Sequence, residues 1–144
     1  MKERRDNQRS KVYRAERLAW GVYDDSVMHK LSMSEITKLV HRMSPAMTYQ
    51  WGPMKGKRRK QVIRVGAGQG ARRAFACSSR VVFPLWARTL PVVCHEMAHI
   101  RAPGWHHGGP FVSEYIRLVR RYIGPTEADI LKQACKECQV KTRG

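Results

Sequence analysis

The sequence lacks long apolar runs and has few cysteines. No stretch approaches the roughly 18 consecutive apolar residues that a membrane-spanning helix needs, and the amino terminus, MKERRDNQRSK, has no apolar signal-peptide core. We therefore expect no membrane partner and a cytoplasmic location. Four cysteines without an export signal are typical of reduced thiols and argue against a disulfide framework.

Acidic side chains are also scarce. The chain has 11 Asp and Glu against 28 Lys and Arg, a formal charge of +17 at pH 7. Such a surface attracts polyanions and releases their counterions, so DNA or RNA is the first partner to consider. The alternative is a solvated basic surface that aids solubility. The predicted nucleic-acid-binding residues are Lys55, Lys57, Arg58, Arg59, Lys60, Arg72 and Arg73.

The chain length of 144 residues is typical of one domain with a real core. We predict a monomer made of a helical part at 1–45, a basic loop at 46–60, and a sheet with the remaining helices at 61–144. Residues 44–60 show no helical or strand periodicity and are predicted to be irregular.

Hydrophobic periodicity predicts an α+β fold with four to five helices and a small antiparallel sheet of about three strands. We expect five helices. The first spans 7–23, and the second begins after a cap at Ser34 and ends before Pro45. The others lie at about 89–101 after a cap at Thr89, at 110–123, and from Thr126 onward. The predicted strands are 61–65, 73–78 and 80–83, and the glycines at 66–70 are typical of a hairpin turn.

The helix at 89–101 contains the motif His95-Glu96-Met97-Ala98-His99. Histidines four residues apart lie on one face of a helix, so a single metal ion can bind both. Glu96 is close enough to hydrogen-bond a metal-bound water without being a ligand. One catalytic Zn²⁺ would lower the pKa of that water to about 7, and Glu96 would carry the proton to the leaving group.

A catalytic zinc site uses three protein ligands, so a third side chain must come from outside the motif. His106 and His107 follow a turn that Pro103 and Gly104 can form, and we favour His107 as the ligand. His106 and Tyr115 are candidates for contact with substrate or with the developing oxyanion, and the alternative for His106 is an exposed bystander.

The segment HEMAHIRAPGWHHGGPF, His95 to Phe111, resembles the active-site segment of SprT-like zinc metallopeptidases, in which H-E-x-x-H is followed by H-G-x-x-F. This resemblance implies a minimal zincin-like domain, with His95, His99 and His107 on zinc and Glu96 in acid-base catalysis. It extends from about residue 73 to Ile123. The opening RDNQRSKVYRAE is similar to a small family of predicted metallohydrolases of actinobacteria and their phages.

Two features depart from the SprT-like pattern: the turn between His99 and His107 is short, and no four-cysteine zinc ribbon follows. Substrate recruitment is therefore expected to differ. We predict a zinc metallopeptidase that hydrolyses proteins associated with nucleic acid. The alternatives are a nucleic-acid-binding protein with a structural zinc and a zinc amidase with a non-protein substrate.

Overall fold

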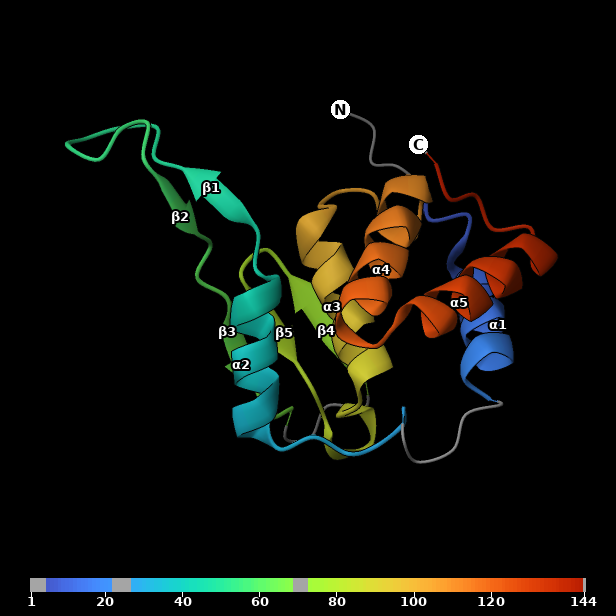
Figure 1. Ribbon diagram of the computed structural model, residues 1–144. Coiled ribbons are helices and arrows are strands. Elements are labelled where there is room, and N and C mark those ends of the chain that lie inside the picture. Colours follow the sequence, from blue (N-terminus) through green and yellow to red (C-terminus); the bar gives the residue numbers. More distant parts are fainter. Residues whose placement is uncertain (1–4, 22–26, 69–72, 144) are drawn as a thin grey trace.

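The computed structural model describes residues 5–21, 27–68 and 73–143. These residues form an α+β fold, as the sequence predicts (Figure 1). The helices are α1 (Arg9–Trp20), α2 (Met33–Met43), α3 (Leu90–Arg101), α4 (Gly109–Tyr122) and α5 (Pro125–Glu137), with a 3-10 turn, η1, at Leu85–Ala87. The strands are β1 (Ala46–Thr48), β2 (Arg58–Lys60), β3 (Arg64–Gly66), β4 (Phe75–Cys77) and β5 (Arg80–Val82).

The three-stranded sheet is mixed, so the prediction of an antiparallel sheet was wrong. Its order is β3-β5-β4, with β5 antiparallel to β4 and parallel to β3. The two-residue turn at Ser78 and Ser79 forces β4 and β5 into a hairpin. Because β3 then pairs with the other edge of β5, the glycine-rich segment after β3 does not close a hairpin, and β4 keeps one edge of the sheet.

Residues 46–60 are not the irregular loop that the sequence predicts. β1 and β2 pair antiparallel, with Ala46 opposite Lys60 and Thr48 opposite Arg58, and the hairpin projects away from the body of the molecule (Figure 1). All residues of both strands are exposed, so no buried face imposes the alternation of apolar and polar residues by which strands are recognised. The predicted strand at 61–65 is found at β3, which begins at Arg64.

Helix α2 begins earlier than predicted. The cap is Ser32, whose hydroxyl accepts a hydrogen bond from the Glu35 amide while the Glu35 carboxylate accepts one from the Ser32 amide. This reciprocal capping box satisfies two backbone donors, whereas Ser34 lies inside the first turn of α2.

Helix α3 lies at the centre of the fold and is buried on almost every side. Eight of its residues are buried, and it contacts α2, α4 and β4. The hydrophobic cluster around it runs from Val12 in α1 to Val140 after α5, because α1 packs against α5 and α5 packs against α4. None of the helices in the described ranges combines the length and apolar character required to cross a bilayer.

Candidate metal centre

Three histidines converge at the carboxyl-terminal half of α3. One ring nitrogen of each of His95, His99 and His107 lies within 4.8 Å of those of the other two. His95 and His99 are one helical turn apart, and the centroid of the His107 ring lies 5.3 Å and 4.8 Å from theirs. The predicted ligand set is therefore brought together. Within the part of the chain that the structure describes, no fourth His, Cys, Asp or Glu joins this group.

The turn between α3 and α4 places His107 rather than His106 at this centre. Gly104 has φ +78° and His106 has φ +50°, so the chain reverses direction within a few residues of Arg101. A side chain on Gly108 would meet the Trp105 carbonyl at 3.0 Å, which explains the glycine there. His107 is buried, whereas the side chain of His106 lines the neighbouring cavity.

Each of the three imidazoles has a second partner behind it. His95 Nδ1 lies 3.0 Å from Glu16 Oε2, and His107 Nδ1 lies 2.7 Å from Asp6 Oδ2. His99 forms a hydrogen bond with the backbone of His106. Histidines that bind metal commonly donate their other ring N–H to a carboxylate or a backbone carbonyl, which fixes the tautomer and the ring orientation. In His95 and His107 this leaves Nε2 as the ligand atom.

Tyr115 belongs to this supporting layer and not to the substrate side. It is 1% exposed, donates a hydrogen bond from its hydroxyl to Glu16 Oε2 (2.8 Å), and accepts one from Trp20 Nε1 (3.0 Å). A hydroxyl held in this way cannot reach a substrate, so the predicted substrate contact was wrong at this residue. The reason is that α4 turns Tyr115 toward α1, an arrangement that the periodicity of α4 alone does not reveal.

Burial and nearby charges shift the pKa values of the three imidazoles in different directions. Burial lowers the pKa of His99 to about 2, and burial also lowers the pKa of His107, with Asp6 opposing the change. Burial alone would lower the pKa of His95, but the charge and hydrogen bond of Glu16 raise it. Glu16 itself would have a raised pKa from burial, yet its contacts with His95 and Tyr115 lower it. An ionised Glu16 therefore favours positive charge on His95, whether a proton or a metal ion supplies it.

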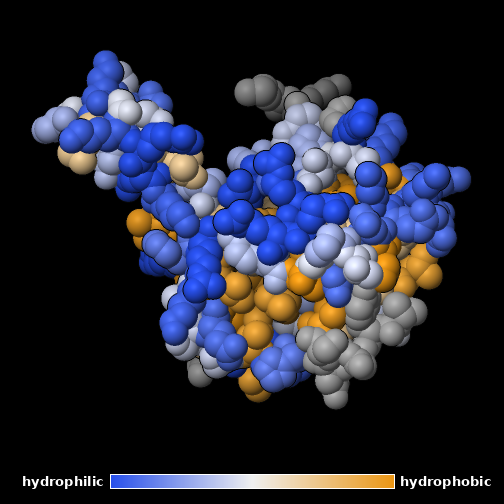
Figure 2. Space-filling view, in the orientation of Figure 1, coloured by the Kyte–Doolittle hydropathy of each residue, from blue (hydrophilic) through white to orange (hydrophobic). Residues whose placement is uncertain are grey.

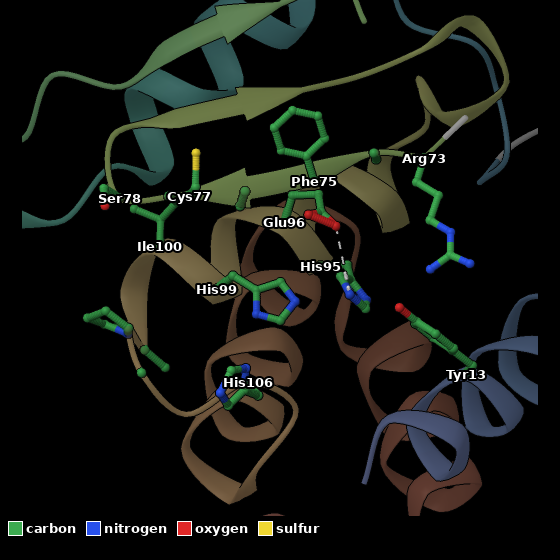
Figure 3. Close-up of a pocket in the computed structure, with 15 residues that line it drawn as sticks. Tyr13, Arg73, Phe75, Cys77, Ser78, His95, Glu96, His99, Ile100 and His106 are labelled. Carbon is green, nitrogen blue, oxygen red and sulfur yellow. Dashed lines mark ion pairs between the residues drawn. The ribbon is translucent and has the colours of Figure 1, made fainter. Parts of the chain in front are cut away.

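Glu96 faces the same centre. Its Oε1 lies 3.8 Å from His95 Nε2, an ion pair drawn in Figure 3, and the residue is 6% exposed. Burial raises the pKa of Glu96, and the nearby negative charge of Glu16 adds to this effect while His95 opposes it. A carboxylate whose pKa is raised toward neutrality is better suited to accept and return a proton near pH 7.

Two buried polar atoms of this cluster, His107 Nε2 and Glu96 Oε2, have no hydrogen-bond partner among the residues that the structure describes. Leaving a buried polar atom unsatisfied costs about 1–3 kcal/mol. A cation held by the three imidazoles would satisfy His107 Nε2, and a water beside it would satisfy Glu96 Oε2. The residues therefore fit a metal ion, and the nitrogen donor set suits a transition metal.

A cavity of about 610 Å³ opens beside the centre (Figure 3). Its lining includes Glu96, His99, His106 and all of residues 73–78, which contain β4. In Figure 3 the side chains of Tyr13 and Arg73 point toward the part of the cavity beside His95. Arg73, which the sequence analysis predicts to bind nucleic acid, thus lines this cavity and is not part of the β1–β2 hairpin.

Sequence reasoning missed Asp6, Glu16 and Tyr13. Asp6 and Glu16 support His107 and His95 across 101 and 79 residues of sequence, and no local spacing signals such pairs. The ring of Tyr13 packs near His95 and His107, with centroid distances of 6.2 Å and 5.4 Å. All three residues fall in the opening segment that resembles the predicted metallohydrolases, which was the one signal that could have identified them.

The remaining basic candidates lie on the β1–β2 hairpin and the turn that connects its strands. Lys55, Lys57, Arg58, Arg59 and Lys60 are exposed. The Lys60 ammonium donates to the carbonyls of His41 and Arg42 at the end of α2, and the Arg59 guanidinium lies 4.6 Å from the centroid of the Tyr49 ring. Lys55, Lys57 and Arg58 thus have the freest side-chain charges for phosphates. Arg72 lies outside the described residues.

Replacing His107 by Ala should abolish stoichiometric metal binding, because only two imidazoles would remain. His106→Ala is the matched control and should keep one ion per chain, since the side chain of His106 is not in the ligand group. Titration of the chelator-treated proteins with Zn²⁺ by calorimetry measures both, with circular dichroism to verify folding. Equal binding by both variants would contradict the assignment of His107.

Glu16→Gln should weaken metal affinity about 10- to 100-fold, because the carboxylate that orients His95 and raises its basicity is lost. Glu114→Gln is the control, since Glu114 pairs with Arg101 and not with a histidine. Competition against a chromophoric chelator measures the two affinities. An affinity for Glu16→Gln equal to that of the wild type would show that this contact does not tune the metal site.

No protein-family model, curated protein or solved structure matches the chain. What the centre does chemically is therefore inferred from its donor atoms, their burial and the groups behind them. These define a cluster of three histidines that could hold a metal ion, with a buried carboxylate beside it.

Proposed function

We propose that this protein is a zinc-dependent metallopeptidase. The observation that carries the proposal is the convergence of three imidazoles from α3 and the following turn, with the buried Glu96 carboxylate beside them. Three protein ligands are typical of catalytic zinc, whereas structural zinc sites usually have four. The SprT-like segment HEMAHIRAPGWHHGGPF supports the same family of activities.

In this mechanism His95, His99 and His107 hold the ion. Zinc, when bound, polarises the substrate carbonyl and makes the attacking water more acidic. Glu96 takes one proton from that water as the water oxygen bonds to the carbonyl carbon. The carbon–nitrogen bond then breaks, and Glu96 returns the proton to the leaving nitrogen, which gives an amine and a carboxylic acid that keeps the other proton of the water. At neutral pH the acid releases this second proton to solvent. Burial raises the pKa of Glu96 and so makes it a better base for the first transfer.

The position of β4 favours a peptide over another amide. β4 is at one edge of the three-stranded sheet, and residues 73–78 line the cavity beside Glu96 and His99. An exposed sheet edge binds an extended peptide by main-chain hydrogen bonds, as an added strand. A peptide paired with β4 would place its backbone carbonyls along the cavity, within reach of the metal centre. A non-protein amide would not use this edge.

The basic hairpin, residues 46–60, is the proposed contact with nucleic acid. It contains no acidic residue, and Figure 2 shows hydrophilic side chains over most of its surface. Trp51 is 84% exposed in the connection between β1 and β2, where its ring can stack on a base. In the proposed function this hairpin brings the peptidase to proteins that are bound to DNA or RNA.

Glu96→Gln should retain zinc and lose peptidase activity by at least about 100-fold, because the amide cannot accept the proton of the attacking water. Metal content and cleavage of casein or of the protein itself, with and without chelator and with and without DNA, are the measurements. Glu114→Gln should keep full activity. Full activity of Glu96→Gln would rule out the proposed mechanism, and a zinc-loaded wild type inactive in every assay would favour a structural site.

Reversing the charges of Lys55, Lys57 and Arg58 to Glu should weaken DNA binding and lower its salt dependence. Each lost phosphate contact reduces the slope of log K against log salt concentration by about 0.9. The control reverses the exposed Lys132, Lys136 and Lys141, which belong to α5 and the segment after it. Fluorescence anisotropy across a salt series measures both. Equal losses in the two variants would assign the effect to net charge rather than to the hairpin.

A further inference from the structure

Gln8 is a buried polar residue at the start of α1 whose side chain does not serve that helix. It occupies the N-cap position of α1 and is 5% exposed, yet its side chain makes no capping hydrogen bond. Short polar side chains such as Ser, Thr, Asp and Asn usually cap a helix at this position. A glutamine amide that is buried here has lost its hydration, so it needs hydrogen-bond partners elsewhere in the protein.

The partners of the Gln8 amide are main-chain groups from two distant segments. Its Nε2 donates to the His107 carbonyl at 2.9 Å and to the Lys141 carbonyl at 3.2 Å, and its Oε1 accepts from the Lys141 amide at 2.6 Å. Both the donor and the acceptor of the side chain are therefore used. Figure 1 shows the segments before α1 and after α5 side by side, in agreement with these contacts.

The His107 carbonyl needs a partner from outside its own helix. The first backbone hydrogen bond of α4 runs from the Val112 amide to the Gly108 carbonyl, so the carbonyl of His107, one residue earlier, lies outside the helix. Because His107 is buried, a main-chain carbonyl left without a partner there would cost free energy. Gln8 supplies the partner from a position 99 residues away in the sequence.

Of the three imidazoles, that of His107 depends most on such support. His95 and His99 belong to α3, whose backbone fixes them one turn apart, whereas His107 belongs to the turn before α4. His106 in this turn has φ +50°, a conformation that is strained for a residue other than glycine and persists only when its surroundings impose it. Asp6 and Gln8 hold His107 at two points, the ring and the carbonyl.

The same side chain also holds the segment that follows α5. Gln139 has φ +57°, which reverses the chain, and Val140 then packs into the core with 7% exposure. This brings the main chain of Lys141 against the Gln8 amide. A conformation of the His107 turn that keeps its bond to Gln8 therefore favours the docked segment as well, and two equilibria linked in this way support each other reciprocally.

We propose that Gln8 is a positioning residue for His107, and that it couples metal binding to the docking of residues 139–143. The proposal rests on metal binding by the three histidines, which is part of the proposed function, and not on peptidase activity. Without the Gln8 hydrogen bonds the His107 turn would occupy other conformations as well. Only a fraction of the molecules would then present the third ligand, and the apparent metal affinity falls in proportion to that fraction.

Gln8→Met tests the positioning role, because methionine has nearly the same length but cannot form these hydrogen bonds. It should weaken Zn²⁺ binding about 10- to 100-fold, the range typical of groups that support metal ligands. The control is Ser44→Ala, which removes another buried hydrogen bond, from the Ser44 hydroxyl to the Val40 carbonyl at the end of α2. It should leave the affinity unchanged.

Competition against a chromophoric chelator measures the three affinities, at a temperature where circular dichroism shows wild type and variants to be folded. Equal affinities of the wild type and Gln8→Met would overturn the positioning role. A loss of the same size in Ser44→Ala would also overturn it, since the effect would then belong to general stability.

Hydrogen exchange of the Lys141 amide tests the coupling in the wild type, without any substitution. This N–H donates to Gln8 Oε1, so saturation with Zn²⁺ should slow its exchange about fivefold or more, as measured by NMR. The Tyr49 amide, which donates to the Lys57 carbonyl in the hairpin, should exchange equally fast with and without Zn²⁺. No change at Lys141, or equal slowing at Lys141 and Tyr49, would contradict the coupling. In Gln8→Met the response of Lys141 should disappear, and its persistence would assign the coupling to other contacts and reject the proposal.

These measurements need no turnover, so they separate the inference from the proposed function. A wild type that binds no Zn²⁺ would reject both. Zn²⁺ binding that does not depend on Gln8 would reject the inference alone. Dependence on Gln8 in a protein that cleaves no peptide would support the inference and reject the peptidase.

Discussion

The hydrogen bond between Glu16 and His95 is the contact on which the centre depends. It joins α1 to α3 at a point where both partners are largely removed from solvent, and Tyr115 of α4 donates to the same carboxylate oxygen. The Glu16 carboxylate of α1 therefore forms hydrogen bonds with side chains of both α3 and α4. Because the negative charge of this carboxylate favours a cation on His95, the packing of the helices and the affinity of the centre for a metal ion follow from the same interaction.

This arrangement places a costly polar cluster inside the hydrophobic core. His95, Glu96 and His107 are each less than 10% exposed, on or beside a helix whose other buried residues are mainly apolar. A buried polar group is tolerated when it has a partner, and two atoms of this cluster have none in the described part of the chain. Asp6, Glu16 and backbone groups thus hold the imidazole rings in place through one nitrogen of each ring. The other ring nitrogens and the Glu96 carboxylate lie close together at the centre of the cluster.

The surroundings of the centre are divided between three surfaces. The edge strand β4 borders the cavity of about 610 Å³, and mostly apolar residues border a second cavity of about 750 Å³. The basic hairpin projects from a different part of the fold (Figure 1). The three surfaces differ in their chemistry: the first includes the segment around β4, the second is rich in aromatic side chains, and the third carries cationic side chains. Among the described residues β1 and β2 pair only with each other, and no residue of this hairpin lines either cavity.

The sequence by itself determined the α+β class and the helix that contains the motif. It also identified His95, Glu96, His99 and His107 as the members of the buried cluster. Helical periodicity and the spacing of histidines are local properties, so they survive without knowledge of the fold. Tertiary structure alone decided the parallel pairing of β3, the hairpin at 46–60, the direction of Tyr115 toward α1, and the support from Asp6 and Glu16. Those features depend on contacts between segments that are distant in the sequence, such as the pairs separated by 79 and 101 residues. Hydrophobic periodicity is a local pattern and does not predict such contacts.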